Sequence, residues 1–237
     1  MLEQVLTPER YATGMTFDQY LAFVASPENL AREGFDVRRF GIIRPRVDWS
    51  AHLREHYAKA RLSDEQAAMI RALVAAPRGP ARVAVVAEEW SSDCRRDLPY
   101  LARLAEAGPL ELRIFVRDGD TAVTGEPRAG EGNGDLMLTL MNERDGKRFA
   151  SIPVAVFLTK DWEELYRYVE FPALYRKDAL IGRMRMPRAG ETPDQTKARA
   201  VREIFELLDS PLFEMWGRAA IDEIVSGIHA RLTLAQA

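Results

Sequence analysis

Apolar residues change their spacing twice along the chain, and these changes divide it into three parts. The first 76 residues show helical spacing, with apolar side chains three and four positions apart. The middle alternates short apolar runs of strand type with helical segments, and the last part is helical again. The pattern predicts a helical N-terminal extension at residues 1–79, an α/β domain at 80–172 and C-terminal helices at 173–237. We expect the three parts to pack into one unit.

Capping signals mark where several of the predicted helices begin. Thr16-Phe17-Asp18-Gln19 and Ser63-Asp64-Glu65-Gln66 are capping boxes, whose Ser or Thr and Gln side chains satisfy the free N–H groups of a first turn. Ser210-Pro211 supplies an N-cap and a first-turn proline for a last helix. Ala76-Pro77-Arg78-Gly79-Pro80 is a cluster of helix breakers and marks the boundary between the first two parts.

The middle part has the pattern of a sheet with crossover helices. Val83-Ala84-Val85-Val86-Ala87 is an unbroken apolar run, typical of a central strand that is covered on both faces. Residues 110–117 alternate apolar and polar side chains and are predicted to form a second strand. Further strands are predicted at 154–158 and 164–171, and helices at 94–107 and 135–142. This alternation of strands and helices predicts an α/β fold.

Composition narrows the class of protein. The chain has 237 residues, of which 47% are hydrophobic and 29% charged, as in soluble globular proteins. It contains no apolar run of about 18 residues, so we expect no membrane partner. Its net charge of −3 provides no basic field for nucleic acid. The single cysteine excludes an intramolecular disulfide and fits a reducing compartment, so we expect a cytoplasmic protein.

One pentapeptide carries the strongest functional signal. Trp90-Ser91-Ser92-Asp93-Cys94 directly follows the first predicted strand, and Ser151-Ile152-Pro153 comes just before the third. This order resembles the thioredoxin superfamily, which has Trp-Cys-x-x-Cys in the first place and an Ile-Pro with a cis bond in the second. The resemblance covers residues 81–171. It implies a thioredoxin-like fold, with a mixed four- to five-stranded sheet flanked by helices and with N- and C-terminal helical additions.

A closer resemblance is to bacterial thioredoxin-like proteins that have a helical N-terminal extension. Gly14-Met15-Thr16-Phe17 matches the start of that group, and Asp97-Leu98-Pro99 and Asp135-Leu136-Met137 match segments further on. Their site has Trp-Cys-Gly-Asp where this chain has Trp-Ser-Ser-Asp. Residues 175–237 match the group poorly.

The resemblance implies a role for each residue of the site. In the family, the first cysteine lies at a helix N-terminus that stabilises its thiolate, and the second cysteine resolves the mixed disulfide. Position by position, Ser91 takes the attacking place, Cys94 the resolving place and Pro153 that of the cis-proline. A partly buried acid of the family, five residues before the tryptophan, falls on Val85. The S-x-x-C site therefore lacks both the nucleophile and the proton-relay carboxylate.

Three functions remain open for this site. In the first, the chain is a non-reductase binding module for a thiol-bearing protein or peptide, which would contact Trp90, Ser92, Asp93, Ile152 and Pro153. In the second, Cys94 acts alone as a monothiol oxidoreductase, although a lone cysteine is most often a small buried apolar residue. In the third, Ser91 hydrogen-bonds the thiolate of bound glutathione, as in a glutathione-dependent transferase. Glutathione is the one cofactor that these alternatives bring in, and the oligomeric state is not predicted.

Two other patterns carry weaker signals. His52-Leu53-Arg54-Glu55-His56 matches the H-x-x-E-H motif, in which two histidines one helical turn apart ligate zinc. The remaining histidine, His229, is remote in sequence, so exposed helix residues are the default interpretation and a zinc protein the remote alternative. Four arginines between residues 38 and 46 and three between 183 and 188 could meet an anionic partner; we expect them to be solvated or paired with carboxylates.

Overall fold

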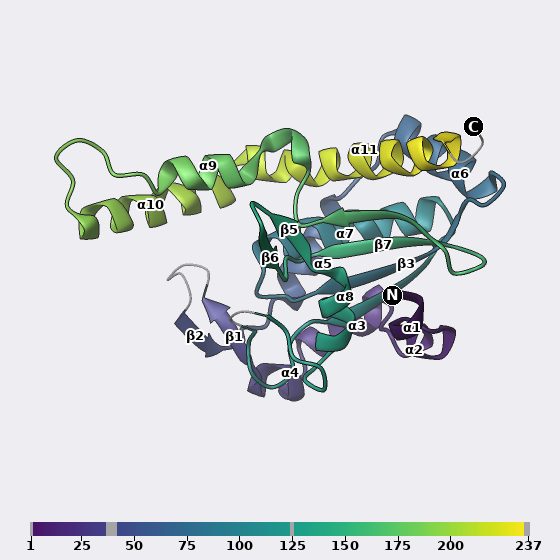
Figure 1. The fold of residues 1–237 in the computed structure, drawn as a ribbon, viewed down its shortest axis with the longest axis horizontal. Coiled ribbons are helices and arrows are strands. Elements are labelled where there is room, and N and C mark those ends of the chain that lie inside the picture. Colours follow the sequence, from purple (N-terminus) through teal and green to yellow (C-terminus); the bar gives the residue numbers. More distant parts are fainter. Residues whose placement is uncertain (1, 37–41, 124–125, 235–237) are drawn as a thin grey trace.

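A four-stranded mixed sheet forms the centre of the molecule. The computed structural model describes residues 2–36, 42–123 and 126–234, with no side-chain description for 36 and 42–44. The sheet consists of β3 (Pro80–Ala87), β4 (Glu111–Val116), β7 (Val154–Thr159) and β8 (Glu164–Val169). Its order is β4-β3-β7-β8; β3 runs parallel to β4 and antiparallel to β7, and β8 is antiparallel to β7 (Figure 1). The predicted α/β fold with a mixed sheet is confirmed.

The two central strands are those with unbroken apolar sequences. Every residue of β7 is buried, and so are the last five residues of β3. Val85 lies opposite Ile114 of β4 and Ala155 of β7, at the middle of the sheet. Since both faces of these strands are covered, polar side chains have no place on either face, which is why alternation is absent from their sequence.

Helices cover the sheet on both sides. In the view of Figure 1, α11 and α6 lie above it, and α1 to α4 and α8 lie below it. Helix α11 packs on α6, α7 and β8, so the C-terminal helix belongs to the core. The helices are α1 (Leu2–Val5), α2 (Pro8–Ala12), α3 (Phe17–Val24), α4 (Pro27–Ala31), α5 (Ser50–Lys59), α6 (Asp64–Ala75), α7 (Ser92–Ala107), α8 (Gly134–Leu140), α9 (Lys177–Met184), α10 (Pro193–Leu208) and α11 (Pro211–Leu234), with a 3-10 turn at Ala173–Tyr175. None of the helices in the described ranges is long and apolar enough to cross a membrane.

Both predicted capping boxes are present. Thr16 and Gln19 cap α3 reciprocally, and Ser63 and Gln66 do the same for α6. Just before α3, the backbone of Met15 pairs with Ile114 at the edge of β4. Gly14 permits this approach, because a Cβ there would lie 2.7 Å from the Phe115 ring. The N-terminal extension is therefore joined to the sheet by backbone hydrogen bonds.

Two hairpins depart from the predicted pattern. The first pairs β1 (Glu33–Asp36) with β2 (Ile42–Pro45), inside the part that was expected to be helical throughout. The second pairs β5 (Asn142–Arg144) with β6 (Lys147–Phe149). Their strands have three or four residues each, too few to show a period, and pairing with a neighbour rather than their own sequence defines them. Helices α9 and α10 extend beyond the sheet at the end of the molecule where the first hairpin lies (Figure 1).

Candidate functional site

The chain turns from strand to helix at Ser91, directly beside its only cysteine. Strand β3 ends at Ala87, Ser91 has the extended backbone of an N-cap, and α7 begins at Ser92. The Ser91 hydroxyl accepts a hydrogen bond from the Cys94 N–H at 3.4 Å. This is the cap that a helix N-terminus needs, since its first N–H groups have no partner within the helix. The hydroxyl in the attacking place thus has a structural use, and Ser91 is only 6% exposed.

Cys94 is fully buried, with no exposed surface. Burial is the main cause that raises the pKa of its thiol far above the ordinary value, and nearby Asp93 and Asp97 raise the pKa further. Hydrogen bonds with the Glu88 backbone and the Ser91 side chain lower the pKa of the thiol, but by less than burial raises it. The thiol is therefore protonated at neutral pH and packed into the core.

The Ile152–Pro153 peptide bond is cis and lies at the start of β7. Both residues are buried, and the Pro153 carbonyl accepts a hydrogen bond from the Glu170 N–H at 2.7 Å. The sheet itself therefore uses this carbonyl.

A buried ionic cluster uses the Asp93 carboxylate. Arg96, which is 1% exposed, donates to Asp93 at 2.9 Å and to both carboxylate oxygens of Asp97 at 2.6 and 2.7 Å. Tyr168 donates its hydroxyl proton to Asp97 at 2.8 Å, and Lys177 forms an ion pair with Asp93. Burial raises the pKa of Asp97, while Arg96 opposes that effect. The cluster ties the N-terminal part of α7 to β8 and to Lys177, the first residue of α9.

A second buried cluster lies under Trp90, and the sequence analysis missed it. Arg46 forms ion pairs with Glu88 and with Glu89, the latter at 2.8 Å. Asp118 donates its backbone N–H to Glu88 at 2.6 Å and accepts a hydrogen bond from the Trp90 indole at 3.1 Å. Burial, followed by the Asp118 charge, raises the pKa of Glu88 to about 7. Two adjacent glutamates after an unbroken apolar strand were the available signal, because such a strand leads directly into the core.

The first arginine stretch contributes one residue to this second cluster. Arg46 has a fully buried side chain, and its pairing with carboxylates agrees with the expectation. Arg38 and Arg39 lie outside the described residues.

A cleft of about 1100 Å³ opens beside the first turn of α7. Trp90, Ser92 and Arg95 form one wall, and Trp49, His52 and His56 at α5 form another. The β1–β2 hairpin and the junction of α10 with α11 complete the lining. Of the predicted contact residues, Trp90 and Ser92 line this cleft, whereas Ser91, Asp93, Cys94, Ile152 and Pro153 do not. The accessible side of the site is therefore the α5 side of α7 and not the cis-proline side.

The comparisons with known proteins agree with the fold. A sequence model of the family described as thioredoxin matches residues 46–185, which is more than half of the chain. The chain belongs to the thioredoxin family. Two solved structures are similar in fold to this thioredoxin-family chain. An HIV epitope-scaffold has a TM-score of 0.53 at 16% identity, covering 94% of this chain and 98% of the scaffold. A Pseudomonas aeruginosa protein of unknown function has a TM-score of 0.52 at 17% identity, covering 93% and 95%. No curated protein matches the chain.

The predicted zinc pair lies in the cleft of this thioredoxin-family chain. The ring centroids of His52 and His56 are 4.0 Å apart. Both side chains are half-buried, whereas the sequence analysis expected them to be exposed. His56 Nδ1 lies 3.6 Å from Glu214 Oε1, and burial followed by the His56 charge lowers the pKa of His52 to about 4. Among the described residues, no three His, Cys, Asp or Glu side chains converge as a metal ion requires. The pair therefore has no third ligand there.

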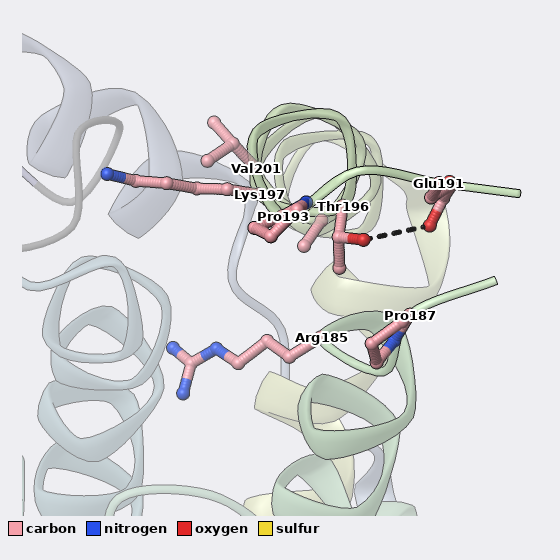
Figure 2. Close-up of a pocket in the computed structure, with 8 residues that line it drawn as sticks. Arg185, Pro187, Glu191, Pro193, Thr196, Lys197 and Val201 are labelled. Carbon is pink, nitrogen blue, oxygen red and sulfur yellow. Dashed lines mark hydrogen bonds between the residues drawn. The ribbon is translucent and has the colours of Figure 1, made fainter.

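A separate cavity of about 490 Å³ lies where α9 meets α10, and Figure 2 shows its lining. Arg185 and Lys197 extend to the same side of the view, and Thr196 donates its hydroxyl proton to Glu191 at 3.1 Å. None of the predicted site residues lines this cavity, and it shares no lining residue with the cleft. Of these two hollows, only the cleft is lined by predicted site residues, namely Trp90 and Ser92.

Proposed function

We propose that this thioredoxin-family chain is a binding module without dithiol turnover, which holds a peptide segment or thiol-bearing ligand in the cleft beside Trp90 and Ser92. The observation that carries the proposal is the state of Cys94: the sulfur is buried, and its pKa is raised. Its neighbour at the attacking place, Ser91, acts as a helix cap.

Disulfide exchange needs a thiolate that can reach its target and a second thiol that resolves the product. A serine hydroxyl replaces the sulfur only with a base beside it. No described histidine or carboxylate hydrogen-bonds to the Ser91 hydroxyl, which accepts the Cys94 N–H instead. Monothiol chemistry would require Cys94 to leave the core, and a transferase role would require Ser91 to give up its cap. Both enzyme alternatives therefore disturb the start of α7.

The cleft supports binding by its size and its aromatic walls. Its volume of about 1100 Å³ lies just above the usual range of small-molecule pockets. Trp90 packs against Phe35 of the hairpin with ring centroids 4.9 Å apart, and its indole is held by Asp118. Because Trp90 is oriented before a ligand arrives, little side-chain entropy is lost when it is covered. The chain has a single cysteine and so no intramolecular disulfide, which fits this role in the reducing cytoplasm.

Insulin reduction with dithiothreitol, followed by turbidity, tests the proposal. We expect no acceleration by the wild-type chain. Ser91→Cys is the matched control, because it restores two sulfurs at the spacing the family uses, and we expect it to form a reducible 91–94 disulfide. Glutathione affinity is measured in parallel by calorimetry. Reduction or glutathione turnover that Cys94→Ala abolishes would show that the chain is an enzyme and would overturn the proposal.

A further inference from the structure

The cleft contains a cation that the fold leaves without a counterion. Arg95, in the first turn of α7, is half-buried and places its guanidinium over the Trp49 ring, 3.8 Å from the centroid. Its Nη1 donates to the Glu89 carbonyl at 2.7 Å. No described carboxylate forms an ion pair with it. Burial lowers the pKa of Arg95 to about 10, so the group still carries its charge at neutral pH.

The other two arginines that line the buried end of the cleft differ from Arg95. Arg46 has Glu88 and Glu89 as counterions, and Arg96 has Asp93 and Asp97. A buried cation is costly unless it is paired, and the fold meets that requirement in both of these cases. Arg95 is the exception among the described arginines of the cleft's inner wall.

A second cation of the cleft lining lies on α11. Arg218 is exposed, and no described carboxylate forms an ion pair with it. The acidic side chains of the lining are Asp209 and Glu214, and Glu214 lies 3.6 Å from His56. Both acidic residues lie at the α10–α11 junction, so Arg95 is the one charge of the described α7 wall without a paired carboxylate, and it stands next to the indoles of Trp49 and Trp90.

We propose that the cleft binds an acidic peptide segment of a partner protein, with a carboxylate on Arg95 and an adjacent apolar side chain against Trp49 and Trp90. This rests on the proposed function, which makes the cleft the ligand site. The planar guanidinium of an arginine binds a carboxylate through two parallel N–H groups. Stacking on Trp49 holds that plane in one orientation, so a bound carboxylate need not order it. Arg218 adds attraction at the open side.

The test uses two labelled pentapeptides, acetylated and amidated, that differ only in charge. One has the sequence Glu-Leu-Phe-Glu-Leu and the other Gln-Leu-Phe-Gln-Leu. Fluorescence anisotropy with the full chain at low salt measures both affinities. We expect the acidic peptide to bind about tenfold more tightly, as one charge-assisted hydrogen-bonded pair provides. The preference should fall steeply as salt is raised.

Arg95→Gln should abolish the preference, and Arg218→Gln, at an exposed position, should reduce it about twofold to threefold without affecting folding. Arg202→Gln is the matched control, since Arg202 lies on α10, is 66% exposed and is not part of the cleft lining; it should leave the preference unchanged. Equal affinity of the wild-type chain for the two peptides, or a preference that survives in Arg95→Gln, overturns this inference while the binding module stands. Binding of neither peptide overturns the inference as well, and glutathione affinity then decides on the proposed function.

Discussion

Replacing Arg96 by methionine probes the ionic cluster that joins α7 to the C-terminal segment. Arg96 is 1% exposed, and its guanidinium donates to Asp93, to both oxygens of Asp97 and to the Glu170 carbonyl at 3.0 Å. Methionine keeps much of the packing against Phe213, whose ring centroid lies 4.5 Å from the guanidinium carbon. It leaves Asp97 charged and buried, with the Tyr168 hydroxyl as its remaining hydrogen-bond donor among the described side chains.

Breaking a buried ion pair from one side lowers the free energy of unfolding by about 3–5 kcal/mol. Urea unfolding followed by circular dichroism measures this loss, and Arg202→Met is the control. Arg202 pairs with Glu206 at 3.7 Å on the surface, where both side chains are 66% exposed, so its loss should be below about 0.5 kcal/mol. Tyr168→Phe removes one hydrogen bond to Asp97 and should cost about 1–2 kcal/mol.

The stability loss of Arg96→Met should depend on pH in a defined direction. Burial raises the pKa of Asp97 in the folded chain, and Arg96 is the first influence that lowers it. Without Arg96 the folded pKa of Asp97 rises further above its unfolded value. The destabilisation of Arg96→Met should therefore be absent below the unfolded pKa and should grow as pH rises through the folded pKa. A loss below 0.5 kcal/mol, or one that does not change between pH 4.5 and 7.5, would refute the reasoning about a buried, uncompensated carboxylate.

Three other predictions follow from the start of α7. Thiol labelling of native Cys94 should be slow and nearly independent of pH between about 6 and 9, because reaction requires local opening; a fast thiol with a low apparent pKa would contradict its burial. In urea unfolding, Ser91→Ala should lower the free energy of unfolding by about 1 kcal/mol and Ser92→Ala by less than half of that, since only Ser91 caps the helix. Equal losses in the two variants would contradict the capping role of Ser91. The pKa of Glu88 is raised to about 7, so its protonated form adds stability below the unfolded pKa that is lost as pH rises through 7; Glu88→Gln should flatten this slope, and an unchanged slope would exclude Glu88 as its source.

The sequence by itself determined the features whose causes are local. The capping boxes at Thr16 and Ser63 are present because an N-cap and its partner lie within one turn of each other. The apolar run before Trp90 is a central strand, and the turn at Ser91 starts a helix, as the family resemblance implied. The short strand Glu33–Asp36 of the first hairpin escaped prediction because four residues show no period.

Only the tertiary structure decided which residues of the site are accessible. Asp93 meets Lys177, and Glu88 meets Arg46, across long stretches of chain, and no local pattern connects such partners. The same holds for the cleft, whose walls come from α5, α7 and the α10–α11 junction. Ser92 and Arg95 face that cleft while Cys94 between them faces the core, because successive residues of a helix point in different directions and packing decides which face is covered. Neighbours a turn apart act through backbone hydrogen bonding, whereas burial and charge pairing depend on segments that meet only after folding.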